Sequence, residues 1–355
     1  MLYLISQLIM GGARKKSKTD QPSSSYLSPI VRYEKDGLRF VEPYDYEFRT
    51  HVKGRWVGTT ILSMCAREFI AQPIEYYDSA IKSGKITVNN NKVSTDYILD
   101  HNDYIRHVTR CVENPVSGAP IDTIFESEDL LVVCKPPSLP VHACGGYRQN
   151  TLLAILEAEN SYSHLHPTHR IDRLTSGLVI LGKSPTITRR ITDSLAREKD
   201  GSARKEYLAL VYGEIKEDMT VTGYIKCIDF RIGKYAFSEN ETPDSKISET
   251  KIFALQFFPE RNETLVRCLP ITGRTHQIRL HLQSIGHPIV NDICYGGTYD
   301  ADHLYAIPQI PSLQHDTNGK MFCGGIFLHA YRYTIGDLEF QAPIPKWAVD
   351  AFRPT

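Results

Sequence analysis

Residues 168–183 read THRIDRLTSGLVILGK, a loop with one aspartate between two arginines that leads into an apolar run. Residues 178–181 are apolar, with Gly177 before them and Gly182 after them, a pattern typical of a buried core strand. Asp172 is therefore expected on a loop at the mouth of that strand. Reactive side chains often occupy such loops, because the strand behind them keeps the loop in place.

The charges around Asp172 bear on what it can do. Arg170 and Arg173 flank it, and nearby positive charge favours the ionised carboxylate. In a partly dry site such a carboxylate is suited to act as a nucleophile or as a general base. The plain alternative is a loop aspartate that pairs with its neighbouring arginines and carries no chemistry. This stretch alone leaves both interpretations open.

The segment HRIDRLTSG at residues 169–177, with the strand that follows it, resembles the signature of the RluA-type pseudouridine synthases. Further segments resemble motifs of that family and follow its order: CKPPSLPVH at 134–142, KEYLALVYG at 205–213, and TGRTHQIRLHL at 272–282, continued by GHPI. The resemblance covers the chain from about residue 121 to its C-terminus. It implies an α+β fold, with a mixed, largely antiparallel sheet as the core of the catalytic domain and helices flanking it.

The resemblance also implies which residues form the catalytic site. Asp172 matches the nucleophile, Tyr207 a tyrosine that stacks on the base and helps to move a proton, and Arg279 the arginine that pairs with the nucleophile. The residues expected to bind the substrate are Arg170, Arg173, Lys205, Arg274, His276 and Leu280. The family implies no cofactor. Whether the carboxylate attacks C1′ of the ribose or C6 of the uracil does not follow from the sequence.

Two helices are expected to support this site. Residues 184–185, Ser-Pro, form a helix start, with an N-cap followed by proline at the first helical position. Helical spacing over residues 275–285 places His276 and Arg279 on one face. From there a bidentate guanidinium can hold the Asp172 carboxylate ionised and oriented.

Composition divides the chain into parts. Residues 11 to about 30 are rich in Ser, Lys, Gln and Pro, and we expect residues 1–30 to form a disordered tail. Residues 31–114 predict an N-terminal extension and a small module, and a Pro- and Gly-rich linker separates them from a catalytic domain over 121–355. Within that domain, residues 214–250 are polar and predict irregular strands, with a mobile loop over residues 238–248.

The small module shows helical periodicity over residues 58–70 and 76–81, then a strand pattern from residue 85. This order resembles an S4-like RNA-binding module, and the family of the catalytic domain supports RNA contact there. The cations suited to contact phosphates are Arg67, Lys82, Lys85 and Lys92. The plain alternative is a small α+β domain whose lysines are only solvated.

The whole composition narrows the class of protein. The 355-residue chain has 41 Lys and Arg against 41 Asp and Glu, which argues against holding nucleic acid by bulk charge and leaves local basic patches. Eight cysteines without a Cys-x-x-Cys pair indicate reduced thiols in an intracellular protein. No apolar run approaches a membrane span. We expect a cytoplasmic location; basic residues at 14–18 keep a mitochondrial or nuclear one open, and Met1 and Met10 are both candidate starts.

Two other functions compete with an RNA-modifying enzyme. His164, His166 and His169 lie close together in the sequence and invite a metal site, hence a metal-dependent hydrolase. No acidic residue lies among them and Pro167 interrupts them, so we expect no metal there. The second alternative is a catalytically inactive RNA-binding protein on the same fold. Retention of all three expected catalytic residues argues against it.

The expected partner is RNA, with tRNA as the leading substrate, and no obligate protein partner is evident. Residues 76–84, the Pro-Val at 115–116 and residues 140–150 look like the eukaryotic branch that modifies uridine 32 of the tRNA anticodon loop. Residues 109–114 depart from the His- and Arg-rich stretch of that branch, which leaves the target uridine open. Flipping a nucleotide costs about a few kcal/mol, and least in a loop, so a stem-loop target is expected.

Overall fold

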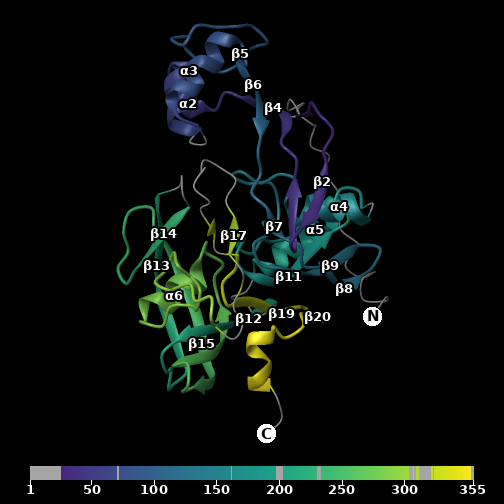
Figure 1. Ribbon diagram of the computed structural model, residues 1–355. Helices are drawn as coiled ribbons and strands as arrows, with labels where there is room; N and C mark the ends of the chain where they lie inside the picture. Colours follow the sequence, from purple (N-terminus) through teal and green to yellow (C-terminus); the bar gives the residue numbers. More distant parts are fainter. Residues whose placement is uncertain are drawn as a thin grey trace. The chain divides into compact units, whose positions relative to one another are not determined.

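The structure is a computed structural model that describes residues 25–69, 72–160, 162–196, 203–229, 233–303, 307, 309–311, 321–322 and 324–352 (Figure 1). Most of the expected tail therefore lies outside the described residues. The chain divides into two compact units: Met1–Pro29 with Tyr44–Arg110, and Ile30–Pro43 with Cys111–Thr355. No helix in the described ranges is long and apolar enough to cross a membrane.

The first unit is a small α+β module with a four-stranded sheet in the order β1-β4-β6-β5. Thr60 caps the first of its α-helices by accepting a hydrogen bond from Ser63 N–H, and the second ends at Gly84 in the left-handed conformation. Both expected helices are thus present with shifted ends. The elements are β1 (Ser25–Tyr26), β4 (Tyr44–His51), η1 (Gly54–Trp56), α2 (Ile61–Glu68), α3 (Ile74–Ser83), β5 (Ile86–Val88) and β6 (Tyr104–Cys111).

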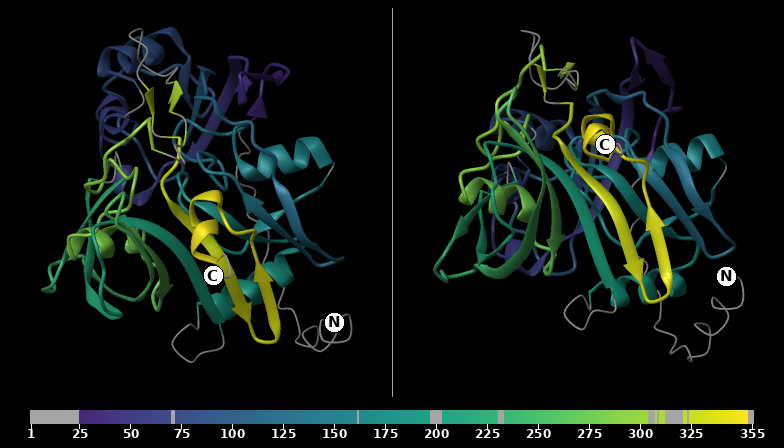
Figure 2. Two further views of the ribbon diagram at one scale, coloured as in Figure 1. Left: turned by 60° about the horizontal axis from the view of Figure 1, so that its bottom comes forward. Right: turned by 90° about the horizontal axis from the view of Figure 1, so that it is seen from below.

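The second unit is built on an 11-stranded sheet, in the order β14-β13-β15-β16-β12-β19-β11-β9-β8, with β10 beside β11 and β20 beside β19. Only β11 and β19 pair in parallel among the described strands of this sheet, so the expected α+β fold with a mixed, largely antiparallel sheet is confirmed. Figure 2 shows β19 and β20 as a hairpin beside β12. The strands are β8 (Asp122–Glu126), β9 (Leu130–Lys135), β10 (His166–Pro167), β11 (Ser176–Gly182), β12 (Ala203–Tyr212), β13 (Met219–Asp229), β14 (Lys234–Ser238), β15 (Lys246–Phe258), β16 (Glu263–Pro270), β19 (Leu328–Ile335) and β20 (Leu338–Gln341).

Two smaller sheets complete the second unit. Strands β2 (Arg32–Lys35), β3 (Leu38–Val41) and β7 (Val116–Ser117) form one, and β17 (Ile310–Pro311) pairs with β18 (Met321–Phe322) in the other. The first of them ties Ile30–Pro43 to the second unit, whereas we expected residues 31–114 to stand together before the catalytic domain. The expectation and the structure differ because β3 pairs with β7, which is distant in the sequence. Composition does not encode such a pairing. Similarly, β1 begins within the stretch expected to be tail.

The core of the second unit explains its apolar runs. Residues 178–181 of β11 are fully buried, as are residues 131–133 of β9, because side chains pack against both faces of the sheet at these strands. Buried residues of α4 (Leu152–Asn160) and α5 (Pro185–Leu195) join this cluster. A second cluster joins α6 (Gln277–Ser284) and η3 (Lys346–Phe352) to β12 and β16.

The helix start at Ser184 and Pro185 is confirmed. The Ser184 side chain accepts a hydrogen bond from Ile187 N–H, and proline occupies the first turn. Ile187, Ile191 and Leu195 face the core, one helical turn apart.

The irregular strands expected over residues 214–250 are in fact regular, because β13, β14 and the start of β15 pair there, and the loop expected at 238–248 corresponds to the connection between β14 and β15. In β13 buried and more exposed positions alternate from residue 219 to 226, so about half of its side chains are polar. That alternation lowers the mean hydropathy and hides the strand from a search for apolar runs.

Gly177 lies where the loop that carries Asp172 enters the sheet. It pairs with Ala330 across the parallel β11–β19 contact and has φ +109°. A Cβ there would lie 2.2 Å from the Ala330 carbonyl oxygen and 2.6 Å from its nitrogen. Both the backbone angle and the close approach of β19 therefore require glycine at this position.

We expect Gly177→Ala to destabilise the second unit by about 3 kcal/mol or more, because left-handed strain and a backbone clash add together. Gly336→Ala is the matched control: φ is +55° but nothing lies within 4 Å of its Cβ, so only about 1 kcal/mol is lost. Urea denaturation followed through hydrogen exchange of β9, β11 and β19 amides measures both. Equal losses for the two variants would contradict the close approach.

Candidate active site

The loop that carries Asp172 is fastened to β11. Thr168 donates from its backbone N–H and its hydroxyl to the Ile180 carbonyl, at 3.1 and 2.9 Å, and the His169 imidazole accepts from Ile180 N–H at 3.2 Å. Thr175 N–H donates to the Asp172 carbonyl at 3.1 Å and closes a turn. The backbone on both sides of Asp172 is therefore fixed by the core strand.

Lys135 of β9 also holds the loop that carries Asp172. Its side chain is fully buried, and its ammonium group donates to the Pro136 carbonyl at 2.9 Å and the Arg173 carbonyl at 3.3 Å. Burial and the positive charge of Arg173 lower the pKa of Lys135 to about 7. The residue after Asp172 is thus held by a side chain of β9.

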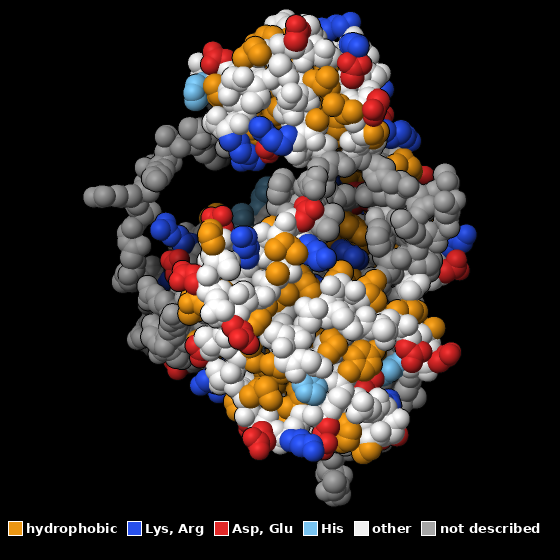
Figure 3. All heavy atoms as spheres, turned by 90° about the vertical axis from the view of Figure 1, so that its left-hand side faces the viewer, with side chains coloured by type: hydrophobic (Ala, Val, Ile, Leu, Met, Phe, Trp, Pro, Cys, Tyr) orange, Lys and Arg blue, Asp and Glu red, His pale blue; other side chains and the backbone are white. Residues whose placement is uncertain are grey.

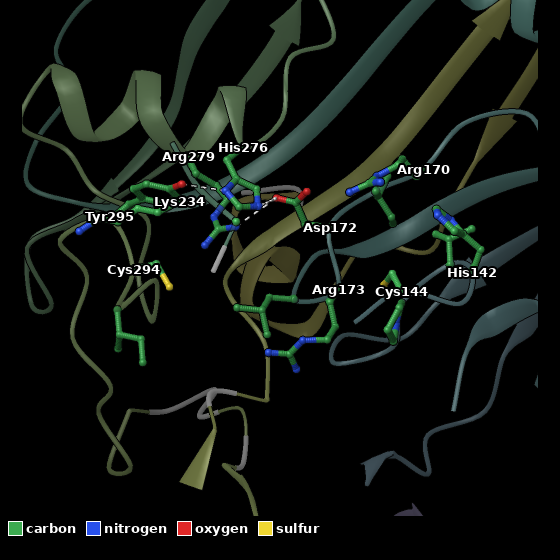
Figure 4. Close-up of a pocket in the computed structure, with 16 residues that line it drawn as sticks. His142, Cys144, Arg170, Asp172, Arg173, Lys234, His276, Arg279, Cys294 and Tyr295 are labelled. Atoms are coloured by element: carbon green, nitrogen blue, oxygen red, sulfur yellow. Dashed lines mark hydrogen bonds and ion pairs between the residues drawn. The ribbon is translucent and has the colours of Figure 1, made fainter. Parts of the chain in front are cut away.

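Arg279 binds Asp172 from α6. Its Nη1 donates to Asp172 Oδ2 at 3.1 Å (Figure 4), and its Nε and Nη2 bind the two Asp292 oxygens at 2.6 and 2.8 Å. The side chains of Arg279 and Asp292 are 4% and 1% exposed, against 21% for Asp172. A bidentate pair therefore fixes the guanidinium, which then orients the more accessible carboxylate.

His276 faces the same oxygen of the Asp172 carboxylate as Arg279 (Figure 4). It precedes α6 in the left-handed conformation, at φ 57°, and its Nε2 is 3.7 Å from Asp172 Oδ2. Gln277 fixes this bend, because its side-chain oxygen accepts from the Thr272 hydroxyl at 2.7 Å and from Arg274 N–H at 3.0 Å. The His276 ring also contacts the Tyr295 hydroxyl.

The charge state of Asp172 follows from these contacts. Burial alone would raise its pKa, but the charge that His276 carries when it is protonated at acidic pH and the charges of Arg279 and Arg170 outweigh burial and hold the pKa below its ordinary value. The carboxylate is therefore ionised at neutral pH. Burial lowers the pKa of His276, which leaves its imidazole neutral.

Two cavities meet at Asp172. The larger has a volume of about 570 Å³ and the smaller of about 310 Å³. Both are lined by Arg170, Ile171, Asp172, His276 and Arg279. The larger is also lined by His142, Cys144, Arg173, Lys234, Cys294 and Tyr295. The smaller is also lined by Thr175, Lys205, Tyr207, Arg274, Ile278 and Leu328.

Tyr207 reaches the smaller cavity from β12. Its hydroxyl lies 2.7 Å from the hydroxyl of Tyr333, a buried residue of β19. The Tyr333 ring also packs edge-on against His169, at 5.0 Å between centroids. Two neighbouring strands therefore set the direction of the Tyr207 ring.

This arrangement is suited to carboxylate chemistry. An ionised, oriented carboxylate that opens to two cavities can attack an electrophilic carbon or remove a proton. Among the described residues, no three His, Cys, Asp or Glu side chains converge as metal ligands. His169, one of the three closely spaced histidines, instead uses Nε2 to accept from Ile180 N–H.

The family follows from comparison with known proteins. The family model described as RNA pseudouridylate synthase matches residues 129–284. The Saccharomyces cerevisiae protein named tRNA pseudouridine(31) synthase is 30% identical over 403 residues, which covers 91% of this chain and 98% of that protein. The chain belongs to the RNA pseudouridylate synthase family. The expected family is thereby confirmed.

Two further relatives match this chain over a smaller share of their own length. Human Pseudouridylate synthase RPUSD2 is 41% identical over 265 residues, covering 74% of this chain and 47% of that protein. The Saccharomyces cerevisiae mitochondrial tRNA pseudouridine(32) synthase is 36% identical over 272 residues, covering 76% of this chain and 57% of that protein. The chain thus spans about half the length of these two relatives.

Most residues that the sequence singled out come together in this synthase-family fold. Asp172 and Arg279 are in contact, and Tyr207 lines the smaller cavity beside them. Of the residues expected to bind the substrate, Arg170 and His276 line both cavities, Arg173 the larger, and Lys205 and Arg274 the smaller.

The placement of Leu280 is corrected. It lines neither cavity and is buried with Ile225 and Tyr295. Its position on α6 turns it toward β13 and β14, two strands that the sequence did not predict as regular. Ile278 and Leu328 supply apolar surface to the smaller cavity instead.

Sequence reasoning missed Asp292 and Tyr295. Both follow the GHPI motif by a few residues, in a segment where only Gly296 and Gly297 signal a turn. An acid shortly after the apolar residues 289–290 was the available signal. No periodicity relates that segment to α6, so its contact with Arg279 is visible only in the fold.

We expect Asp292→Asn to lower the stability of the second unit by about 3 kcal/mol, because Arg279 loses the charge that compensates its burial. Asp193→Asn is the control. Its carboxylate lies 3.9 Å from Arg189 on the surface, and the loss should stay below about 1 kcal/mol. Urea denaturation with hydrogen exchange of β12 and β19 measures both. Similar small losses would show that Asp292 does not support Arg279.

Proposed function

We propose that the chain is an RNA pseudouridine synthase that isomerises a uridine through Asp172. The observation that carries the proposal is the ionised carboxylate at the junction of two cavities, aimed by a buried arginine. Family membership supplies the reaction class. The position of Tyr207 beside the smaller cavity supports that cavity as the site of the flipped base.

The chemistry conserves all atoms of the substrate. In one route an Asp172 oxygen bonds to ribose C1′ while the C1′–N1 bond breaks, and the uracil rotates. Its C5 then bonds to C1′, the ester bond breaks, C5 loses its proton and N1 gains one. In the other route the same oxygen adds to C6 across the C5=C6 double bond, the C1′–N1 bond breaks and C5 bonds to C1′. Loss of the C5 proton then expels the carboxylate from C6 and restores the double bond, while N1 gains a proton. Both routes need the ionised carboxylate that Arg279 maintains.

The surrounding residues take the roles that their positions favour. Tyr207 stacks on the base and assists proton transfer, and Arg170 occupies the space that the extruded nucleotide leaves. Arg173, Lys205, Arg274 and His276 bind phosphate or base around the two cavities. On the face shown in Figure 3, basic and acidic side chains are interspersed, so RNA contact depends on such local groups rather than on bulk charge.

We infer that the substrate is tRNA and the target uridine 32. The motifs of the eukaryotic branch and the name of the yeast mitochondrial relative support this target. The relative named tRNA pseudouridine(31) synthase makes uridine 31 the direct competitor. Positions 31 and 32 are adjacent in the chain of a tRNA, so one transcript can test them together.

We also infer that the first unit, as an S4-like module, contacts the RNA backbone through Arg67, Lys82, Lys85 and Lys92. In the structure Lys82 pairs with Asp78 at 2.8 Å on an exposed surface, a weak pair that phosphate can replace. The proposed site of action is the cytoplasm. The competing location is the mitochondrion, which is part of the name of the yeast uridine-32 relative. Imaging of the tagged full chain distinguishes the two locations.

The test uses the purified full chain and a tRNA transcript with uridine at positions 31 and 32. We expect one carbodiimide-dependent primer-extension stop at position 32, unchanged by EDTA. Asp172→Ala should lower the rate by more than about 10³-fold, because the reacting group is removed. Asp193→Ala, an exposed acid on α5, should leave the rate unchanged.

Each other result has a definite meaning. A stop at position 31 alone would contradict the target but not the enzyme. Activity that persists in Asp172→Ala would contradict the nucleophile. Binding of tRNA without any modification would favour the inactive RNA-binding protein, and loss of activity in EDTA would favour a metal-dependent reaction.

A further inference from the structure

The contacts of His276 determine which of its two ring nitrogens carries the proton. Its backbone is in the left-handed region, at φ 57°, which is uncommon for a residue other than glycine. Such backbone strain persists where surrounding contacts enforce it, and it occurs often at functional sites. The bend places the ring between the Asp172 carboxylate and the Tyr295 hydroxyl (Figure 4).

The Tyr295 hydroxyl has one proton to donate. Tyr235 N–H donates to its oxygen at 3.3 Å, and His276 Nδ1 lies 2.7 Å from the same oxygen. No other acceptor for this hydroxyl occurs among the described residues. Burial raises the pKa of Tyr295 to about 12, so the hydroxyl keeps its proton. Counting donors and acceptors therefore makes Tyr295 the donor and Nδ1 the acceptor.

The other ring nitrogen leads to the same assignment. His276 Nε2 lies 3.7 Å from Asp172 Oδ2, and the carboxylate is ionised. A lone pair on Nε2 would face that negative charge and be repelled, whereas an N–H is attracted. A neutral imidazole that accepts at Nδ1 carries its proton on Nε2.

We propose that Tyr295 is a positioning residue that holds neutral His276 with its proton on Nε2, directed at Asp172 Oδ2. Arg279 donates to the same oxygen, at 3.1 Å. No hydrogen bond to Oδ1 occurs among the described residues, so Oδ1 is the oxygen that reacts with the substrate. The proposal rests on the proposed function, in which Asp172 is the nucleophile.

The expected benefit is orientation of the nucleophile. The Arg279 hydrogen bond and the electrostatic attraction of the His276 Nε2–H, 3.7 Å away, both act on Oδ2, so together they restrict rotation of the carboxylate and stabilise its charge when the bond to the substrate breaks. The Tyr295 ring has a separate contact, because the Arg279 guanidinium carbon lies 4.7 Å from its centroid. Tyr295→Phe keeps that contact and removes only the hydroxyl.

The variant also has a spectroscopic signature. Donation to Nδ1 is available only to the neutral ring, so its loss should raise the pKa of His276. The other charged or titratable groups that face His276 are Asp172, Arg279, Asp292, Arg170 and Tyr235, and Tyr295→Phe leaves each of them in place.

The experiment is long-range ¹H–¹⁵N NMR of the labelled full chain without RNA, with His276→Gln to assign the signals. Wild type should show a protonated Nε2 and an unprotonated Nδ1. Tyr295→Phe should mix the two tautomers and raise the pKa of His276. In single-turnover tRNA reactions it should lower the rate about fivefold to tenfold with unchanged Kd for tRNA, the effect of one lost hydrogen bond.

Tyr212→Phe is the matched control, because its hydroxyl bonds Thr298 at 3.1 Å and neither residue contacts Asp172. It should change neither the His276 signals nor the rate. A proton on Nδ1 in wild type, or His276 signals unchanged in Tyr295→Phe, would overturn the proposal. So would a tautomer change without any change in rate. Because the spectra need no RNA, this failure is distinct from failure of the proposed function.

Discussion

The Arg279 guanidinium binds two carboxylates, through Nε and Nη2 to Asp292 and through Nη1 to Asp172. A buried arginine needs compensating charge, and a bidentate partner provides it with fixed geometry. Asp292 provides that charge, so Nη1 of Arg279 remains to bind the Asp172 carboxylate, which lines both cavities. The Asp172 carboxylate is thus oriented by a group whose own position is already determined.

The sheet brings these groups together from distant parts of the chain. The parallel contact of β11 with β19 requires Gly177, and that contact places the Asp172 loop beside the strand of Tyr333. β12 lies on the other side of β19 and directs Tyr207 into the smaller cavity. Buried charge, a left-handed histidine and a buried lysine all cost stability. The large apolar core around β9 and β11 offsets that cost.

Local sequence signals made part of the fold and of the site around Asp172 predictable. The core strand after Asp172, the helix start at Ser184 and the helical spacing of Arg279 are all encoded within about ten residues, and the family resemblance joined them. Asp292 and Leu280 show the limit. Asp292 contacts Arg279 with no periodic relation to α6, and the neighbours of Leu280 lie on strands whose alternating polarity concealed them. Long-range contacts of this kind require the fold.

The most direct test of the shared guanidinium is the single-turnover rate of Arg279→Lys on tRNA, measured beside its Kd for the same tRNA. Lysine keeps the positive charge but cannot bind Asp172 and Asp292 in one fixed fork. We expect a rate more than about 100-fold below wild type, with Kd within about twofold, since misplacement of the Asp172 carboxylate affects the reaction and not binding. A rate within about threefold of wild type would contradict it, because charge alone would then suffice.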